Sequence, residues 1–141
     1  MRRKSLWVVV AIALAAATSL AQNGTSVWTG VYTKAQAERG AELYADTCAA
    51  CHGNDLEGIE RAPALAGGTF GQRWDGATLK KLFERVQDMP PGDPAKRLTD
   101  QRCVDVLAFL LRENGMPAGT AAMDADTTAL AGITFSATKP K

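Results

Sequence analysis

The sequence predicts an all-α fold of one domain, and three observations point to it. Apolar residues recur with helical spacing in three segments, which begin near residues 33, 75 and 100. A strand-like alternation appears only at Ile133-Thr134-Phe135, and it has no obvious partner strand. The chain also contains Cys48-Ala49-Ala50-Cys51-His52, directly after the first helical segment. About 120 residues follow an N-terminal leader, which is the length of a single domain.

The first 21 residues have the features of a secretory signal peptide. A basic start at residues 2–4 precedes the apolar run 6–17, and Ser19 and Ala21 supply the small residues of a cleavage site after Ala21. The sequence therefore predicts export to the periplasm. An uncleaved membrane anchor is the alternative, although the apolar run is short for the ~20 residues that a membrane-spanning helix needs.

Cleavage changes the charge of the chain. The whole sequence holds 16 Lys and Arg against 15 Asp and Glu, and residues 2–4 carry three of the basic side chains. The mature chain therefore has 13 basic and 15 acidic residues, a net charge of −2. This balance argues against a nucleic-acid-binding protein, which is usually strongly basic. Attachment to a membrane is expected only if the leader is retained.

Residues 22–32 are polar and are predicted to link the leader to a domain at 33–115. Thr33 and Gln36 have the spacing of a capping box, so a helix is expected to begin here and to run to the cysteine motif. Gly40 lies inside this helix, where it costs ~1 kcal/mol relative to Ala. Tyr44 follows one turn later on the same face. We expect another helix to cross closely at this point.

The spacing Cys48-x-x-Cys51-His52 is that of covalent haem attachment. Two thiols on one helical turn can each add to a vinyl group of haem, and the adjacent imidazole is then held against the iron. A thioredoxin-type site would need a strand before the motif, where this sequence is helical. A zinc site would need about four ligands, whereas the chain has three Cys and one His in all. The motif predicts one haem c, bound through Cys48 and Cys51.

Residues 61–68 have neither helical nor strand periodicity and are predicted to form a loop beside the haem. A ligand histidine normally donates its second ring N–H to a carbonyl or a carboxylate. We expect the backbone carbonyl near Pro63 to accept this hydrogen bond from His52.

Two further helices are predicted. One begins at residue 75 or 76 and ends by residue 88 or 89, because Pro90 disfavours helical geometry at the residue before it. The other begins after the cap residue Thr99 and ends near Asn114.

Cys103 falls in the apolar pattern of this last helix. Its thiol is expected to be buried, and a disulfide between two chains is the alternative. The C-terminal extension, residues 116–141, is rich in Ala and Thr. We expect it to wrap the domain, with one helical turn near residues 126–130.

Methionines are the candidates for the second axial ligand of the iron. His52 is the only histidine, so a second histidine ligand from this chain is impossible. Met89 begins the proline-rich loop 89–94, in which a stiff backbone can hold a weakly binding thioether. We predict Met89 as the ligand. Met116, Met123 and an iron without a protein ligand on this side are the alternatives.

These motifs resemble a class I (monohaem) cytochrome c. The resemblance covers residues 33–115 and is carried by five stretches: Cys48–His52, Pro63-Ala64-Leu65, Trp74, Met89-Pro90 and Val106-Leu107-Ala108-Phe109-Leu110. It implies a cytochrome c fold, with three main helices around one covalently attached haem, long loops and a C-terminal wrapping tail. It also implies that the first and last helices cross at right angles, through Gly40 and Tyr44 on one side and Val106 and Phe109 on the other.

The resemblance also assigns roles to cavity residues. In this family a proline carbonyl accepts the hydrogen bond of the ligand histidine, which implies Pro63. A tryptophan bonds a haem propionate, which implies Trp74, with Arg73 or Arg61 as the charge partner. The stretch 114–119 and the tail are similar to cytochrome c domains and subunits found beside quinoprotein (PQQ) dehydrogenases.

Histidine and methionine ligation suits an electron carrier, because a thioether favours reduced iron. We therefore predict a one-electron carrier that is not an enzyme. It is expected to meet redox partner proteins, such as a dehydrogenase or an oxidase, as a monomer or as a subunit of a redox complex. A dedicated electron-accepting subunit of a periplasmic PQQ-type dehydrogenase is one alternative; a five-coordinate haem that binds a gas or reduces peroxide is another. Small and apolar residues are expected around the haem edge: Ala49, Ala50, Ala64, Pro90 and Pro91.

Overall fold

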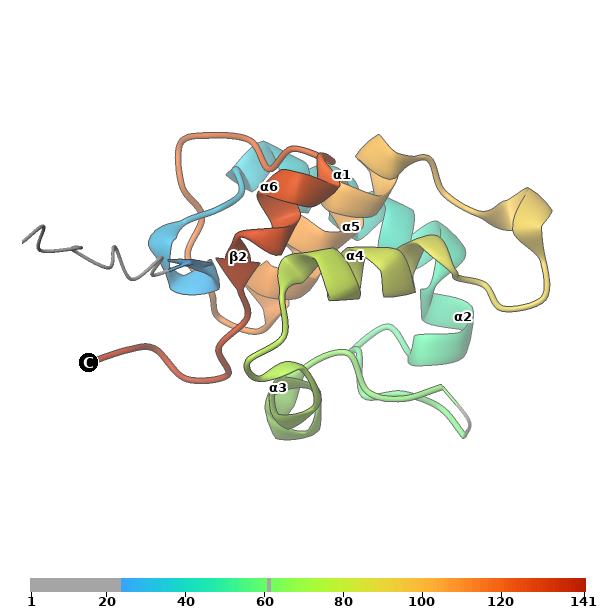
Figure 1. The fold of residues 1–141 in the computed structure, drawn as a ribbon. Helices are drawn as coiled ribbons and strands as arrows, with labels where there is room; N and C mark the ends of the chain where they lie inside the picture. The colour runs from blue at the N-terminus through green and yellow to red at the C-terminus, as the bar shows by residue number, and fades with distance from the viewer. Residues whose placement is uncertain (1–23, 61) are drawn as a thin grey trace, which may run out of the picture.

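The computed structural model describes residues 24–60 and 62–141 (Figure 1). The predicted signal peptide and its cleavage site after Ala21 lie outside these residues, as does Arg61. The described part is mostly helical, which confirms the predicted all-α class. Its elements are β1 (Thr25–Ser26), η1 (Val27–Thr29), α1 (Lys34–Thr47), α2 (Ala49–His52), α3 (Gly67–Trp74), α4 (Leu79–Gln87), η2 (Pro94–Lys96), α5 (Asp100–Glu113), α6 (Thr127–Ala131) and β2 (Ile133–Thr134), where η marks a 3₁₀ helix.

Both long helices begin where the sequence predicted. The Thr33 hydroxyl accepts a hydrogen bond from the Gln36 backbone N–H, and the Gln36 side chain accepts one from the Thr33 N–H, so the capping box before α1 is complete. Helix α5 begins after Thr99, although the hydroxyl of this residue makes no capping bond. It ends at Glu113, within one residue of the expected position.

Two expectations about helices 67–87 were wrong. Helix α4 begins at Leu79 and not at residue 75 or 76, because Gly76 has a left-handed backbone (φ 76°) and the chain turns there. Helix α3 occupies residues 67–74, where no helix was expected. It is short and begins with two glycines, which have low helix propensity, so neither its apolar spacing nor its composition stood out in the sequence.

Helices α1 and α5 cross in direct backbone contact at Gly40. A Cβ atom at this position would lie 1.9 Å from the carbonyl oxygen of Asp105 and 2.8 Å from Cβ of Phe109. One turn later, the Tyr44 ring packs on the Phe109 ring with 5.0 Å between their centroids. The expectation that another helix crosses at Gly40 is confirmed, since no residue larger than glycine allows this approach.

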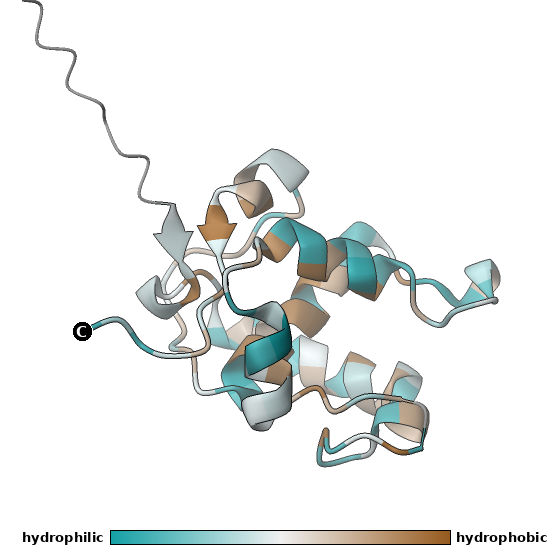
Figure 2. Ribbon diagram, turned by 60° about the horizontal axis from the view of Figure 1, so that its bottom comes forward, coloured by the Kyte–Doolittle hydropathy of each residue, from teal (hydrophilic) through white to brown (hydrophobic). Residues whose placement is uncertain are grey.

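Apolar side chains form two clusters on either side of this crossing. One lies among α1, α2 and α5 and contains Tyr44, Val106 and Phe109. The larger one joins α4 and α5 to the tail and contains Met116 and Met123. Figure 2 shows hydrophilic residues on the outer face of α4 and hydrophobic ones on the side that faces α5.

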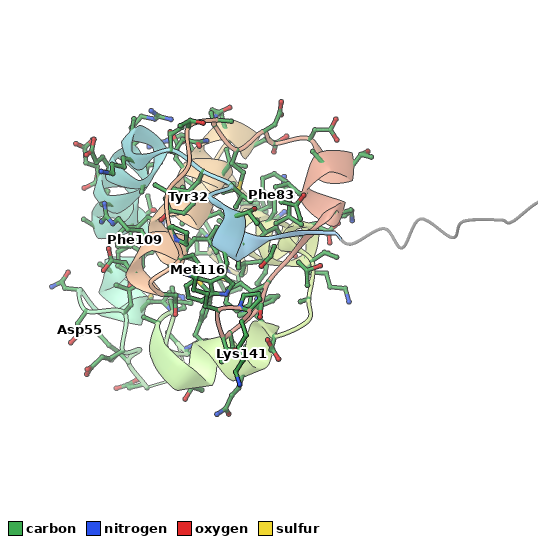
Figure 3. All side chains as sticks on the ribbon, turned by 90° about the vertical axis from the view of Figure 1, so that its left-hand side faces the viewer. Tyr32, Asp55, Phe83, Phe109, Met116 and Lys141 are labelled. Atoms are coloured by element: carbon green, nitrogen blue, oxygen red, sulfur yellow. The ribbon has the colours of Figure 1, made fainter. Side chains whose placement is uncertain are left out.

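The two ends of the described chain pair with each other. Strand β2 lies parallel to β1, with Thr25 opposite Ile133, so the strand-like stretch of the tail does have a partner. The segment predicted as a linker contains the fully buried Val27 and Tyr32. The Tyr32 hydroxyl donates to the Met116 carbonyl at 2.7 Å, and Figure 3 shows both residues on this side of the molecule. The tail thus wraps over α4 and α5 and ends beside the N-terminal segment (Figure 1).

The Cys103 side chain is completely buried, in agreement with the predicted buried thiol. Its Sγ points to the Leu98 carbonyl oxygen at 3.8 Å. Among the described residues, no helix is long and apolar enough to span a membrane.

Gly40→Ala is expected to lower the free energy of unfolding by about 1–3 kcal/mol, because the added methyl overlaps backbone atoms and the two helices must move apart. Gly68→Ala is the matched control, since a methyl added there would have open space for 4 Å around it. Denaturant titrations of both variants measure the effect. A Gly40→Ala protein as stable as the parent would show that the crossing is looser than described.

Stability is expected to depend on pH through Cys103. Burial, followed by the nearby Asp100 carboxylate, raises the pKa of this thiol from about 9 to about 11. The unfolded chain ionises first, so the free energy of unfolding falls as the pH rises through this window. Denaturant titrations at several pH values should show a smaller fall for Cys103→Ala than for the parent. An equal fall in both proteins would assign the effect to other groups.

Candidate haem site

The cysteine motif lies where α1 gives way to α2. Helix α1 ends at Thr47, and the single turn of α2 carries the motif to His52. The Tyr44 hydroxyl donates to the carbonyl oxygen of Gly53 at 2.6 Å and so ties the end of the motif back to α1. Burial raises the pKa of Tyr44 to about 12, so this phenol stays protonated and keeps its hydrogen bond at neutral pH.

His52 makes the hydrogen bond that was predicted for it. Its Nδ1 donates to the Pro63 carbonyl oxygen at 2.8 Å. A carbonyl can only accept, so Nδ1 carries the proton and Nε2 keeps its lone pair. This tautomer is the one in which the imidazole can bind a metal through Nε2 while its orientation is held from behind.

The loop that brings Pro63 to His52 is held by close backbone contacts. Gly58 has φ 82°, and a Cβ there would lie 2.6 Å from the Ala62 carbonyl oxygen and 2.7 Å from the Ala64 nitrogen. The Gly58 N–H also donates to the His52 carbonyl oxygen at 2.9 Å. The loop therefore folds back on the motif, and glycine is needed at position 58 for both its conformation and its space.

A cavity of about 490 Å³ lies beside the motif, with walls from α1, α2, α3, α4, α5 and the loops between them. Its size is within the ~300–1,000 Å³ of typical ligand pockets. It brings together every predicted site residue that the structure describes: Cys48, Cys51, His52, Pro63, Arg73, Trp74 and Met89.

The lining of the cavity suits haem, which is a large apolar ring that carries two propionate groups. Most of its exposed surface is apolar, with Leu82, Val86 and Leu110 among the contributors. Two thiols, one imidazole and one thioether are available for covalent attachment and for iron. These are the donors that haem c uses, so the residues fit the group that the motif predicts.

Met89 is the only methionine among the described residues that lines the cavity. Met116 and Met123 are each only 4% exposed and pack in the larger apolar cluster. Both are held there through their backbones, since the Met116 carbonyl bonds Tyr32 and the Met123 backbone bonds Gln36 twice. Of the three candidate methionines, Met89 lines the cavity and the other two lie in the core.

Several cavity residues were missed from the sequence. Phe70 lies on α3, a helix that was not expected. Arg85 is exposed on α4, yet it also lines the cavity, as does Lys96. Ala49, expected at the haem edge, is buried in the apolar cluster of α1, α2 and α5 instead, because it is on the inner side of α2. Arg85 is four residues before Met89, so a helical projection that placed the two side chains on one face would have identified Arg85 as a cavity residue.

No cluster of three or more His, Cys, Asp or Glu side chains that could hold a metal ion occurs in residues 24–60 and 62–141.

Comparison with known proteins identifies the family. Residues 35–110 match the family described as cytochrome c oxidase, cbb3-type, subunit III. The chain is also 34% identical over 85 residues to cytochrome c-551 of Bacillus subtilis (strain 168), an alignment that covers 60% of this chain and 70% of that protein. No solved structure gives a significant match.

The residues that line the cavity, from Tyr44 to Leu110, all fall within the matched range. Proteins of this kind carry electrons on a haem that is bound covalently through two cysteines. This chain therefore belongs to the cytochrome c family, with one haem c attached through Cys48 and Cys51.

Proposed function

We propose that the protein is an exported one-electron carrier whose iron is bound by His52 on one side and by Met89 on the other. The observation that carries this proposal is that both residues line the same cavity as Cys48 and Cys51. When bound, the haem supplies an iron that alternates between the ferrous and ferric states. The residues around it have to hold that iron in one geometry in both states.

The hydrogen bond to Pro63 suits His52 to this role. The Pro63 carbonyl accepts its Nδ1 proton and so fixes both the tautomer and the plane of the ring. Because the loop behind Pro63 is packed against Gly58, the imidazole has little room to swing. A ligand held in this way needs little rearrangement when the charge of the metal changes.

Met89 follows α4 directly. The last turn of the helix continues into the loop through hydrogen bonds from the Asp88 N–H to the Glu84 carbonyl and from the Met89 N–H to the Val86 carbonyl. Pro90 and the proline after it restrict the backbone on the other side. The thioether is thus held from both directions, which favours a bond that is intrinsically weak.

The apolar wall and the basic residues of the cavity have different roles in holding the cofactor. Leu82, Val86 and Leu110 line the cavity and would exclude water from a bound ring, which would favour reduced iron over the more highly charged oxidised form. We assign Trp74 and Arg73, on the last turn of α3, to the haem propionates. Arg73 forms no ion pair with any of the described acidic residues, so its charge is available.

Redox partners are proposed to dock at the mouth of the cavity, where Ala50, Ala64, Pro90 and Pro91 contribute small or apolar surface. Electron transfer needs only a small and short-lived interface. The predicted leader at residues 1–21 supports a periplasmic location for these encounters.

A second candidate function is a dedicated electron-accepting subunit of a periplasmic PQQ-type dehydrogenase. The tail favours it, because the sequence of residues 114–119 and of those after them carries the resemblance to cytochromes found beside such enzymes. In the structure this tail is packed on the domain and contributes Met116, Met123 and Phe135 to the larger cluster.

Met89→Leu is expected to abolish the weak far-red absorption band of the oxidised protein that sulfur ligation produces, and to lower the reduction potential. Carbon monoxide should then bind rapidly to the reduced variant. Met116→Leu and Met123→Leu are volume-conserving controls and should keep the band. Loss of the band in a control, with retention in Met89→Leu, would refute the ligand assignment. Rapid carbon monoxide binding to the parent would favour the five-coordinate alternative.

Size-exclusion chromatography of the tagged protein, purified from the periplasm of its own cells, separates the two functions. A free carrier, which exchanges electrons with several partners, is expected to elute as a monomer. Stoichiometric elution with a PQQ-containing dehydrogenase would instead establish the dedicated subunit.

A further inference from the structure

Helix α3 forms one wall of the haem cavity, but among the described residues its backbone does not lie close along any other helix. It contributes Phe70, Arg73 and Trp74 to the lining. Helix α1 packs along α5, and α4 packs along α5 and α6, whereas α3 shares no comparable contact with any other described element. Figure 1 shows it set apart, below α4. A helix of eight residues is not stable alone, so other parts of the chain must hold it.

The first turn of α3 is held by Asn114, at the end of α5. The Asn114 side-chain oxygen accepts from the Gly67 N–H at 3.1 Å, and its amide group donates to the Leu65 carbonyl at 3.0 Å. One side chain thus fixes the entry into the helix.

The last turn of α3 is held by three consecutive tail residues, Phe135–Ala137, which we name the clasp. The Gly76 N–H donates to the Phe135 carbonyl at 2.9 Å. The Ala137 N–H donates to the Asp75 carboxylate at 2.8 Å, and Asp75 directly follows the last residue of α3. The clasp therefore bonds the two residues that come immediately after α3.

The N-terminal segment anchors the clasp from behind. The Trp28 indole N–H donates to the Ser136 carbonyl at 2.9 Å. The Phe135 N–H donates in the other direction, to the Ala77 carbonyl at 2.8 Å. The pairing of β1 with β2 precedes these bonds directly in the chain.

Side chains carry the contact from the clasp to the cavity. Phe135 is fully buried, and its ring lies edge-on to that of Phe70, with 5.8 Å between the centroids. Phe70 in turn packs on Trp74 at 6.3 Å. Gly71 lies against Ala137, whose Cβ is 3.2 Å from the position that a Cβ of residue 71 would take. Phe70 and Trp74 both line the cavity, and the clasp residues do not.

We propose that the clasp positions α3 against the haem and so controls how much water reaches that side of the ring. Its residues act through Phe70 and Trp74, and none of them lines the cavity. If the clasp opens, α3 moves outwards and the surroundings of the iron become more polar. Polar surroundings stabilise the oxidised form, so the reduction potential falls. The expected change in reduction potential rests on the proposed electron-transfer function. The expected position of α3 does not.

Asp75→Ala in the haem-loaded protein tests the clasp with little risk to folding, because Asp75 is exposed. Hydrogen exchange followed by mass spectrometry should be several-fold faster in peptides covering residues 67–76 and unchanged in those covering α5. The reduction potential should shift downwards. Asp75→Asn retains the oxygen that accepts from the Ala137 N–H, so its hydrogen exchange should match that of the parent and its potential should lie above that of Asp75→Ala.

The sign of the shift in reduction potential distinguishes an effect of the position of α3 from an effect of the lost Asp75 charge. Removing a carboxylate near the haem would by itself raise the potential, and would do so equally in Asp75→Ala and Asp75→Asn. Equal upward shifts in both variants, with unchanged exchange in α3, would overturn the proposal. Faster exchange that extends equally to α5 in Asp75→Ala would overturn it too, because the contact would then stabilise the whole domain.

Two truncations provide a second, independent measurement. A chain that ends at Thr134 lacks the clasp, and one that ends at Ala137 retains it. Faster exchange in α3 and a lower potential are expected only for the shorter chain. Parent-like behaviour of the shorter chain would refute the proposal; if that chain does not fold, the Asp75 pair decides.

Recording the far-red band for each protein allows Met89 ligation and the role of the clasp to be tested separately. Its absence from the parent would refute Met89 ligation, whereas the exchange of α3 would still report on the clasp. Its presence in every variant, with the expected change in α3, would support both.

Discussion

The backbones of α1 and α5 touch at Gly40, and the position of the haem motif depends on this contact. Because the Asp105 carbonyl occupies the space of a side chain, α1 can approach α5 in only one register. Beside the crossing, Arg39 holds the nearly buried Asp105 carboxylate through two hydrogen bonds of 2.8 Å. Further along, Tyr44 packs on Phe109 and bonds the end of the motif. Because these contacts fix the position of α1, they also fix the position of the cysteine motif that follows its C-terminal end.

The cavity is built from segments that serve different purposes. The α1–α5 pair and α2 supply the attachment side, with His52 held by Pro63. Helix α4 and the loop after it supply Met89 and much of the apolar wall. Helix α3 supplies the basic and aromatic side, and it is held by Asn114 at one end and by the tail at the other. Such a site suits electron transfer, since a rigid, mostly apolar cavity reorganises little when the charge of the iron changes.

Much of this arrangement was predictable from short stretches of sequence. The capping box at Thr33, the crossing at Gly40 and the hydrogen bond from His52 to Pro63 were all expected, and the structure contains each of them. Helix α3 and the true start of α4 were not expected. Both depend on Gly76, where the backbone turns left-handed and bonds to a tail residue almost sixty positions away. No local pattern reports a contact of that kind.

The sequence by itself determined the covalent chemistry: two thiols and an imidazole within five residues specify haem c wherever the chain places them. It also determined that any second axial ligand from this chain is not a histidine, because His52 is the only one. The tertiary structure alone decided that Met89 lines the cavity while Met116 and Met123 are in the core. It also decided that the tail supports a wall of the site. The reason is physical: neighbouring residues are brought together by covalent bonds, whereas distant ones meet only where packing of the whole chain brings them together.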